Sequence, residues 1–323
     1  MTDTALIHGF YLTGDKKGRR FTLDDIDDAM QDEALTWAHF DYTNEGAQAW
    51  LTQHSQLDEP IIDALLSDET RPRAHIVNDG VLLSLRGVNL SQGADPEDMV
   101  SIRLWIDRKR IVSTRRRPLR STEDLVERIQ EGDTPNSIGE FVALLTDRLT
   151  ERMQETIHDI EDHIDQIQEN LVSDTSSETR AQIANLRRKA IALRRYLSPQ
   201  REAMTQLQNE KINLFNEDER VQIREVADHL LRHIEDLDAV RDRAAVTQEE
   251  LVNRISEQLN NRMYWLSIVT VLFLPLGFLT GLLGINVGGI PGADNPQAFA
   301  IFVGIVAGIL IAQLIYFKHK GWF

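Results

Sequence analysis

Two stretches near the C-terminus decide the fold: WLSIVTVLFLPLGFLTGLLGI at residues 265–285 and AFAIFVGIVAGILIAQLIYF at residues 298–317. They are 21 and 20 residues long and contain no charged side chain. At about 1.5 Å per residue, either helix would cross the roughly 30 Å hydrocarbon core of a bilayer. A core helix of a soluble protein is rarely apolar on every side over such a length. The sequence therefore predicts two transmembrane helices, with the lipid bilayer as a partner.

The charges around these stretches predict their orientation. The connecting loop, 286–297, has no Lys or Arg, whereas Arg262 precedes the first stretch and Lys318 and Lys320 follow the second. Because basic residues accumulate on the cytoplasmic side, we expect both termini to be cytoplasmic in a multi-pass protein of the cell inner membrane. The loop would then face outside, and residues 1–264 would lie in the cytosol.

Composition excludes several classes of function. Of the chain's charges, 33 of 35 basic and 50 of 51 acidic residues precede residue 265. Such an acidic segment argues against nucleic acid as a partner and attracts cations. Without any Cys, a metal must be held by oxygen or imidazole. We find no motif of nucleotide, zinc-protease or serine-hydrolase chemistry, and so expect neither an enzyme nor a bound cofactor.

The first of three predicted segments, 1–136, mixes strand and helix patterns and is read as a cytosolic α/β domain. Asn78-Asp79-Gly80 is a hairpin turn signal between two of the strands. The expected strands are 6–12, 35–40, 74–77, 81–85, 100–106 and 110–114, and the expected helices are 45–54, 58–66 and 121–131. A basic cluster of Arg115, Arg116, Arg117 and Arg120 is interpreted as a solvated surface patch or as an intersubunit partner for the acidic excess.

The second segment, 137–264, is predicted to be a helical stalk. Its first helix begins at the capping box Ser137-x-x-Glu140 and its last at Asn216-x-x-Glu219. The expected helices run over 139–171, over 178–212 with a bend at Pro199, and from 217 onward. The third segment, 265–323, holds the two membrane helices and the outer loop.

An apolar stripe at spacings of three and four follows the last stalk helix. Its members are Val226, Leu230, Ile234, Leu237, Val252, Ile255, Leu259, Met263 and Leu266. The stripe continues into the first membrane stretch, where Pro275 need not end a helix. We therefore expect one helix of about 70 residues, or roughly 105 Å. Its seam predicts packing against neighbouring helices or against another copy of the chain, a homo-oligomer.

Two membrane helices cannot enclose a pathway, so transport would need a ring of subunits. The membrane stretches have no ionisable side chain, which leaves hydroxyls, amides and backbone carbonyls to contact an ion. Gly284-Ile285-Asn286 stands where the first stretch ends: the glycine permits a break in the helix and the Asn offers an uncharged oxygen. A helix C-cap explains the same tripeptide equally well.

The arrangement of these segments, the Gly-x-Asn tripeptide and the basic tail at 318–322 resembles the CorA family of divalent-cation transporters over essentially the whole chain. The run NRMYWLSIVTVLFLPLGFLTGLLGINVGGIPGADNP is more similar to the ZntB branch, the zinc transporters. Ordinary CorA proteins have Gly-Met-Asn followed by an aromatic residue and an acidic loop. Here Ile285 stands in place of the methionine, Val287 in place of the aromatic residue, and residues 288–294 in place of the acidic loop. These departures favour zinc over magnesium.

The resemblance implies an α+β membrane protein that forms a homopentameric funnel, with the last long helix lining the pore. Gly284, Ile285 and Asn286 would be the selectivity filter, and five copies of Asp294 would form a carboxylate ring, although a loop turn also explains that aspartate. The pore-lining positions carried over are Asn260, Met263, Leu266, Thr270, Leu274, Gly277 and Gly281.

Histidines are further candidate metal ligands, because zinc accepts imidazole and carboxylate. His229 and His233 lie four residues apart beside Asp228 and Asp236. His158 and His163 form similar pairs with Asp162 and Asp159. Helical spacing places each pair on one face, although so highly charged a helix also produces such pairs by chance on solvated faces.

We therefore interpret the sequence as a zinc transporter of the inner membrane, coupled to protons, with uptake favoured over efflux. Coupling would have to use loop or cytosolic groups, or hydronium. One alternative is a CorA-type Mg²⁺, Co²⁺ or Ni²⁺ channel gated by cytosolic divalent cations. Another is a membrane-anchored coiled-coil sensor or scaffold.

Overall fold

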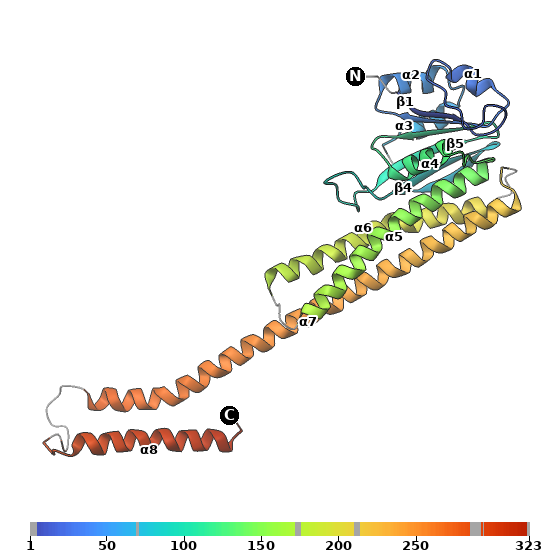
Figure 1. Ribbon diagram of the computed structural model, residues 1–323. Helices are drawn as coiled ribbons and strands as arrows, with labels where there is room; N and C mark the ends of the chain where they lie inside the picture. Colours follow the sequence, from blue (N-terminus) through green and yellow to red (C-terminus); the bar gives the residue numbers. More distant parts are fainter. Residues whose placement is uncertain are drawn as a thin grey trace. The chain divides into compact units, whose positions relative to one another are not determined.

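The computed structural model describes residues 5–68, 71–171, 176–209, 214–284, 292 and 294–321 (Figure 1). The chain divides into two compact units, Met1–Gln248 and Glu249–Phe323. Both the predicted α/β domain and most of the predicted stalk belong to the first unit, because helices of the stalk pack on strands of the sheet. The division into three segments at residues 136 and 264 stays a prediction.

A six-stranded sheet organises the first unit, in the order β1-β2-β6-β5-β4-β3. All neighbours are antiparallel except β2 and β6. The predicted hairpin is confirmed: Val77 pairs with Gly80, Asn78 has a φ of 53°, and a Cβ on Gly80 would overlap the Trp105 ring. The strands are β1 (Leu6–Tyr11), β2 (Thr36–Asp41), β3 (Arg73–Val77), β4 (Gly80–Gly87), β5 (Val100–Ile106) and β6 (Arg110–Arg115).

Short helices cover one face of this sheet, where Phe40 stacks on Trp50 at 5.0 Å between ring centroids. They are α1 (Ile26–Gln31), α2 (Glu45–Gln53) and α3 (Glu59–Leu66). The sequence patterns missed α1, which has six residues and buries only Ile26 and Ala29. On the other face, the ring of Trp37 meets Phe141 of a long helix at 5.1 Å.

The remaining helices are α4 (Arg120–Gln130), α5 (Ile138–Asn170), α6 (Ser177–Asn209), α7 (Glu217–Leu283) and α8 (Ala298–His319). They match the predicted stalk and membrane helices closely. Helix α6 continues through Pro199, and α7 continues through Pro275. The first half of the predicted apolar stripe is buried within the chain, namely Val226, Leu230, Ile234 and Leu237.

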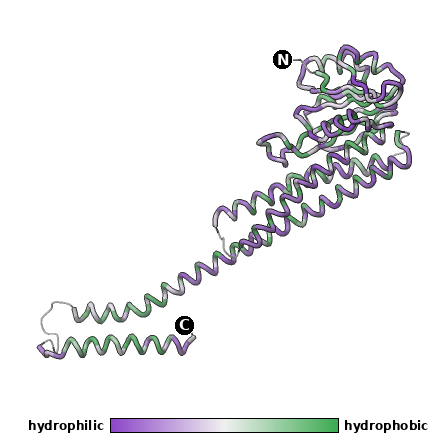
Figure 2. Tube along the Cα trace, in the orientation of Figure 1, coloured by the Kyte–Doolittle hydropathy of each residue, from purple (hydrophilic) through white to green (hydrophobic). Residues whose placement is uncertain are grey.

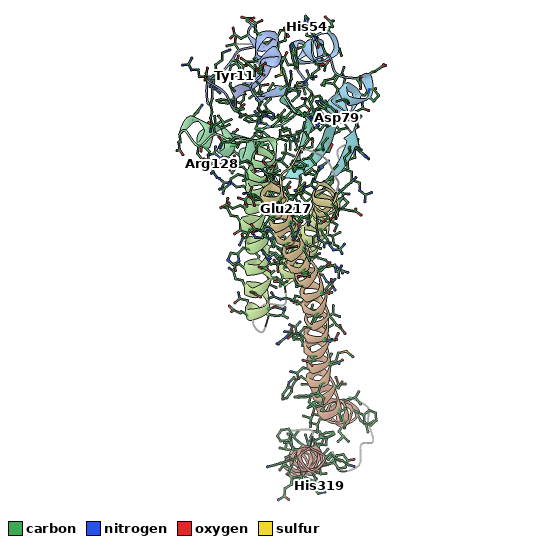
Figure 3. All side chains as sticks on the ribbon, turned by 90° about the vertical axis from the view of Figure 1, so that its right-hand side faces the viewer. Tyr11, His54, Asp79, Arg128, Glu217 and His319 are labelled. Atoms are coloured by element: carbon green, nitrogen blue, oxygen red, sulfur yellow. The ribbon has the colours of Figure 1, made fainter. Side chains whose placement is uncertain are left out.

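Both predicted N-caps form, and the box at Asn216 is reciprocal, whereas at Ser137 the Glu140 carboxylate accepts from the N–H of the preceding residue, Asn136. The Ser137 hydroxyl accepts from the Glu140 N–H at 3.1 Å, and the Asn216 side chain accepts from the Glu219 N–H at 2.9 Å. The Glu219 carboxylate in turn accepts from the Asn216 N–H at 2.7 Å and also from the Ser137 hydroxyl. Figure 3, which labels Glu217, shows the start of α7 near the sheet. One buried carboxylate therefore joins the first turns of α5 and α7.

The second unit contains the end of α7 and all of α8. Two helices of the described chain, Glu217–Leu282 and Ala298–His319, are long and apolar enough to cross a membrane. Figure 2 shows α8 and the last part of α7 as mainly hydrophobic, whereas α5 and α6 alternate. Of the apolar window in α8, none is buried in the single chain. These side chains therefore require lipid or other subunits around them.

Candidate ion pathway and cytosolic cavities

The predicted pore-lining residues share one exposed face of α7. The side chains of Met263, Leu266 and Leu274 are 65%, 67% and 66% exposed within the single chain. At about 100° per residue, the spacings of three and four between successive members keep them on one side of the helix. The whole face is exposed, comprising Asn260, Met263, Leu266, Thr270, Leu274, Gly277 and Gly281.

The opposite side of this part of α7 is the less exposed one. Ile268 is 2% exposed, and the partly covered positions Leu272, Pro275 and Leu279 follow it at helical spacing. In α8, the buried residue is Phe317. Helix α8 thus accompanies one side of α7, and no other described residue of the chain covers the predicted pore face, as lining a pathway between subunits would require.

The exposed face offers oxygen atoms but no charge. The hydroxyl of Thr270 donates to the carbonyl of Leu266 in its own helix at 2.8 Å. Its oxygen lone pairs stay available to a passing ion or its water. Such a lining suits a cation that keeps much of its hydration shell, as small divalent ions prefer.

The predicted filter is only partly described. The Gly284 N–H donates to the Thr280 carbonyl at 2.9 Å, so the glycine continues the last turn of α7. Ile285 and Asn286 lie outside the described residues. Asp294 is exposed in a turn before α8. Its ring of five carboxylates stays a prediction.

Histidines from two of the predicted pairs meet at one cavity between α5 and α7. This cavity has a volume of about 380 Å³. His158 comes from α5, and His229 and His233 from α7. Carboxylates stand beside them: His158 Nε2 lies 3.7 Å from Asp162, and His233 Nδ1 lies 3.9 Å from Asp236. Sequence spacing could pair neighbours on one helix but could not bring the two helices together.

His163 lies elsewhere. It lines a cavity of about 470 Å³ between α5 and α6, together with Asp159 and the Lys189–Glu97 ion pair. Its ring contacts the backbone carbonyl of Asp159. Across the described residues, no three His, Asp or Glu side chains are placed so that they could hold a metal ion together. Metal binding by the stalk histidines stays a prediction.

Burial favours the neutral form of His233. Its side chain is 9% exposed, and burial lowers its pKa, opposed mainly by the charge of Asp236. A neutral imidazole is the form that binds a metal. It is also the form that a buried seam tolerates, so the shifted pKa agrees with either role.

An acidic cavity of about 320 Å³ adjoins the histidine cavity, with His229 on both walls. Glu140 and Asp147 reach it from α5 and Glu225 from α7. Carboxylate oxygens suit hard divalent cations. This cavity therefore holds a small part of the acidity of residues 1–264.

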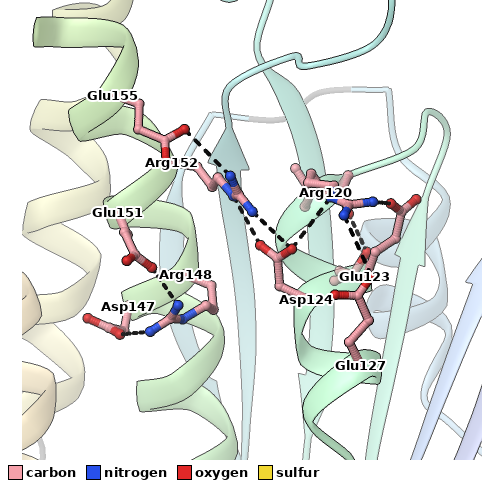
Figure 4. A network of polar contacts seen from close by, with 11 residues as sticks. Arg120, Glu123, Asp124, Glu127, Asp147, Arg148, Glu151, Arg152 and Glu155 are labelled. Carbon is pink, nitrogen blue, oxygen red and sulfur yellow. Dashed lines mark hydrogen bonds and ion pairs between the residues drawn. The ribbon is translucent and has the colours of Figure 1, made fainter. Parts of the chain in front are cut away.

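Three arginines of the basic cluster, Arg116, Arg117 and Arg120, are paired within the chain, whereas the buried Nη1 of Arg115, at the end of β6, has no hydrogen-bond partner among the described residues. Arg117 binds Asp98, and Arg116 lies 3.7 Å from Asp68. Figure 4 shows Arg120 among three carboxylates of α4, Glu123, Asp124 and Glu127. These arginines therefore pair with carboxylates of their own chain, and a role between subunits stays a prediction.

Comparisons with known proteins agree with this architecture. The sequence model of the family described as CorA-like Mg²⁺ transporter protein matches residues 32–319. The divalent cation transporter CmaX of Pseudomonas aeruginosa is 41% identical over 99% of this chain and 97% of its own length. The zinc transport protein ZntB of Yersinia enterocolitica is 35% identical over 90% and 88%.

A solved structure extends the match to the fold. The structure of the full-length CmaX protein covers 100% of this chain and 99% of its own, with a TM-score of 0.84 and 39% identity. The predicted family and the predicted fold of the single chain are therefore confirmed, whereas the homopentameric funnel stays a prediction, and the family consists of transporters rather than enzymes. The chain belongs to the CorA family and is a divalent-cation transporter.

Proposed function

We propose that this protein carries Zn²⁺ across the inner membrane as a homopentamer, with both termini cytoplasmic and with uptake coupled to the proton gradient. The observation that carries the pathway is the uncharged face of α7 from Asn260 to Gly281, which no other described residue covers. Five such faces around an axis would enclose a path whose walls α8 does not cover. Asn286 would supply the filter oxygen at its outer end, and Asp294 would concentrate cations there.

Two observations support zinc. The filter carries Ile285, and the loop after it lacks the acidic pattern of magnesium-transporting relatives. A relative 35% identical over most of the chain is described as a zinc transport protein. The membrane helices have no ionisable side chain. Proton coupling would therefore involve Asp294, the histidine cavity or hydronium.

The test is metal flux into liposomes that contain the purified full-length protein. We expect Zn²⁺ influx that rises when the exterior is made acidic, with Mg²⁺ in excess causing little inhibition. Asn286→Ala should reduce influx at least tenfold, whereas Asn295→Ala, in the same outer loop, should leave it nearly unchanged. Flux that ignores the pH gradient would refute proton coupling, and equal flux of Mg²⁺ would refute zinc selectivity.

The second candidate is a Mg²⁺, Co²⁺ or Ni²⁺ channel closed by cytosolic divalent cations. The acidic cavity of Glu140, Asp147 and Glu225 favours it, since hard cations prefer such oxygen ligands. This candidate predicts that millimolar Mg²⁺ on the cytosolic side closes the path. The zinc transporter predicts no such closure. Family membership favours transport over the membrane-anchored scaffold.

Zinc binding by His158, His229 and His233 is a separate proposal. It requires their side chains to turn toward one another in the shared cavity. Calorimetric zinc titration of the wild type and of His229→Ala would test it, with His163→Ala, at the other cavity, as the matched control.

A further inference from the structure

One hydrogen bond joins the two membrane helices at an unusual place. The Gln313 Nε2 in α8 donates to the backbone carbonyl of Val271 in α7 at 3.3 Å. Amide hydrogens are the only groups of Gln313 that a carbonyl can accept from, so the orientation of the amide is fixed by this contact. The other amide atom, Oε1, is buried without a hydrogen-bond partner among the described residues.

The Val271 carbonyl needs this donor because of Pro275. In an α-helix, the carbonyl of residue 271 would accept from the N–H of residue 275, which is a proline in α7 and has no N–H. In hydrocarbon, no water replaces the missing bond, and an unsatisfied carbonyl is costly. Helix α8 therefore supplies from outside the one bond that the sequence of α7 removes.

Two further observations indicate that the match is specific. Within 298–317, Gln313 is the only amide, and Tyr316 is the only other side chain with a hydrogen-bond donor. Val271 lies about 9 Å from the start of the first stretch and Gln313 about 6 Å from the end of the second, so antiparallel helices place them at similar depth. By contrast, Thr270 and Thr280 bond carbonyls of their own helix.

We infer that Gln313 is a positioning residue for transport: it holds α7 at the Pro275 break and thereby sets the place of Thr270 and Leu274 on the pathway. This inference rests on the proposed function of α7 as the pathway lining. Without the amide, the bare Val271 carbonyl would seek water, and the only water at that depth is in the pathway. The helix would then rotate or bend about Pro275.

A double-mutant cycle tests this inference on the full-length protein in liposomes. Gln313→Met should lower maximal flux about three- to tenfold, the range expected for one hydrogen bond within a membrane, and leave KM unchanged because the filter is not altered. Pro275→Ala restores the N–H for Val271. In that background, Gln313→Met should leave the flux unchanged and should leave or raise the thermal midpoint, since the Val271 carbonyl then accepts from the N–H of residue 275 and no longer needs the amide. Leu314→Met, one residue along α8, is the matched control and should show no coupling.

The outcomes separate the two proposals. If Gln313→Met lowers flux equally in the wild-type and Pro275→Ala backgrounds, the positioning role is overturned. If Gln313→Met alone does not fold, the inference requires that the double variant fold, and failure of both overturns it. If the wild type carries no divalent cation, the proposed function fails. The coupling between the two substitutions in the thermal midpoint still decides whether the Gln313 amide replaces the hydrogen bond that is missing at Pro275.

Discussion

Replacing Glu219 by Ala should loosen the start of α7. The carboxylate is 7% exposed, accepts from the Asn216 N–H at 2.7 Å and from the Ser137 hydroxyl, and so joins two helix N-termini. Loss of the reciprocal cap is worth about 1 kcal/mol. Loss of a second bond to a charged acceptor adds about 1–1.5 kcal/mol. Local opening of the first turn should therefore become easier by about 2 kcal/mol, or about 30-fold.

Hydrogen–deuterium exchange of the segment 214–222, followed by mass spectrometry, measures this opening. Glu219→Gln is the matched control, because an amide keeps the size and can still accept from the Asn216 N–H; its exchange should rise by only a few fold. Gly139→Ala should act like Glu219→Ala, since the new Cβ would overlap the Glu219 carboxylate. Exchange within twofold of wild type for Glu219→Ala, or equal effects of Ala and Gln, would show that the carboxylate does not join the helices.

Three further predictions concern single side chains. Arg152→Met should destabilise the first unit by about 1–2 kcal/mol in thermal unfolding, because Arg152 makes a bidentate pair with the largely buried Asp124 of α4. Arg148→Met should cost under about 0.5 kcal/mol, because the carboxylates that Arg148 contacts lie on its own helix and are themselves exposed. Equal costs would contradict this reasoning. Burial, aided by nearby arginines, lowers the pKa of His8 to about 4, so stability present above pH 6.5 is lost as pH falls toward 4, and His8→Gln should lose less over that window in pH-dependent unfolding. This chain has no cysteine, so a single introduced thiol reports on its own position. Leu274→Cys should react with a water-soluble thiol reagent because it faces the proposed pathway, whereas Ile311→Cys, on α8 and away from that pathway, should not. The reverse labelling would show that Leu274 does not line the pathway.

Local signals in the sequence account for most of the helices and strands. The capping boxes at Ser137 and Asn216 predicted where α5 and α7 begin because each is a hydrogen-bonding rule that acts within four residues. The turn at Asn78 was equally local. Helix α1 escaped because six residues with two buried side chains give no periodicity to detect.

The sequence by itself determined the two membrane helices, the long α7 and its uncharged face, because these depend on hydrophobicity and helical period along one segment. Only the tertiary structure decided which segments meet. His158 lines the same cavity as His229 and His233, whereas His163 lines a different one. The Ser137 hydroxyl donates to Glu219, and the Gln313 amide of α8 donates to the Val271 carbonyl, which has no N–H partner at Pro275. Each of these is a contact between residues at least 42 positions apart along the chain or between different helices, and helix-to-helix register is set by side-chain packing rather than by local pattern.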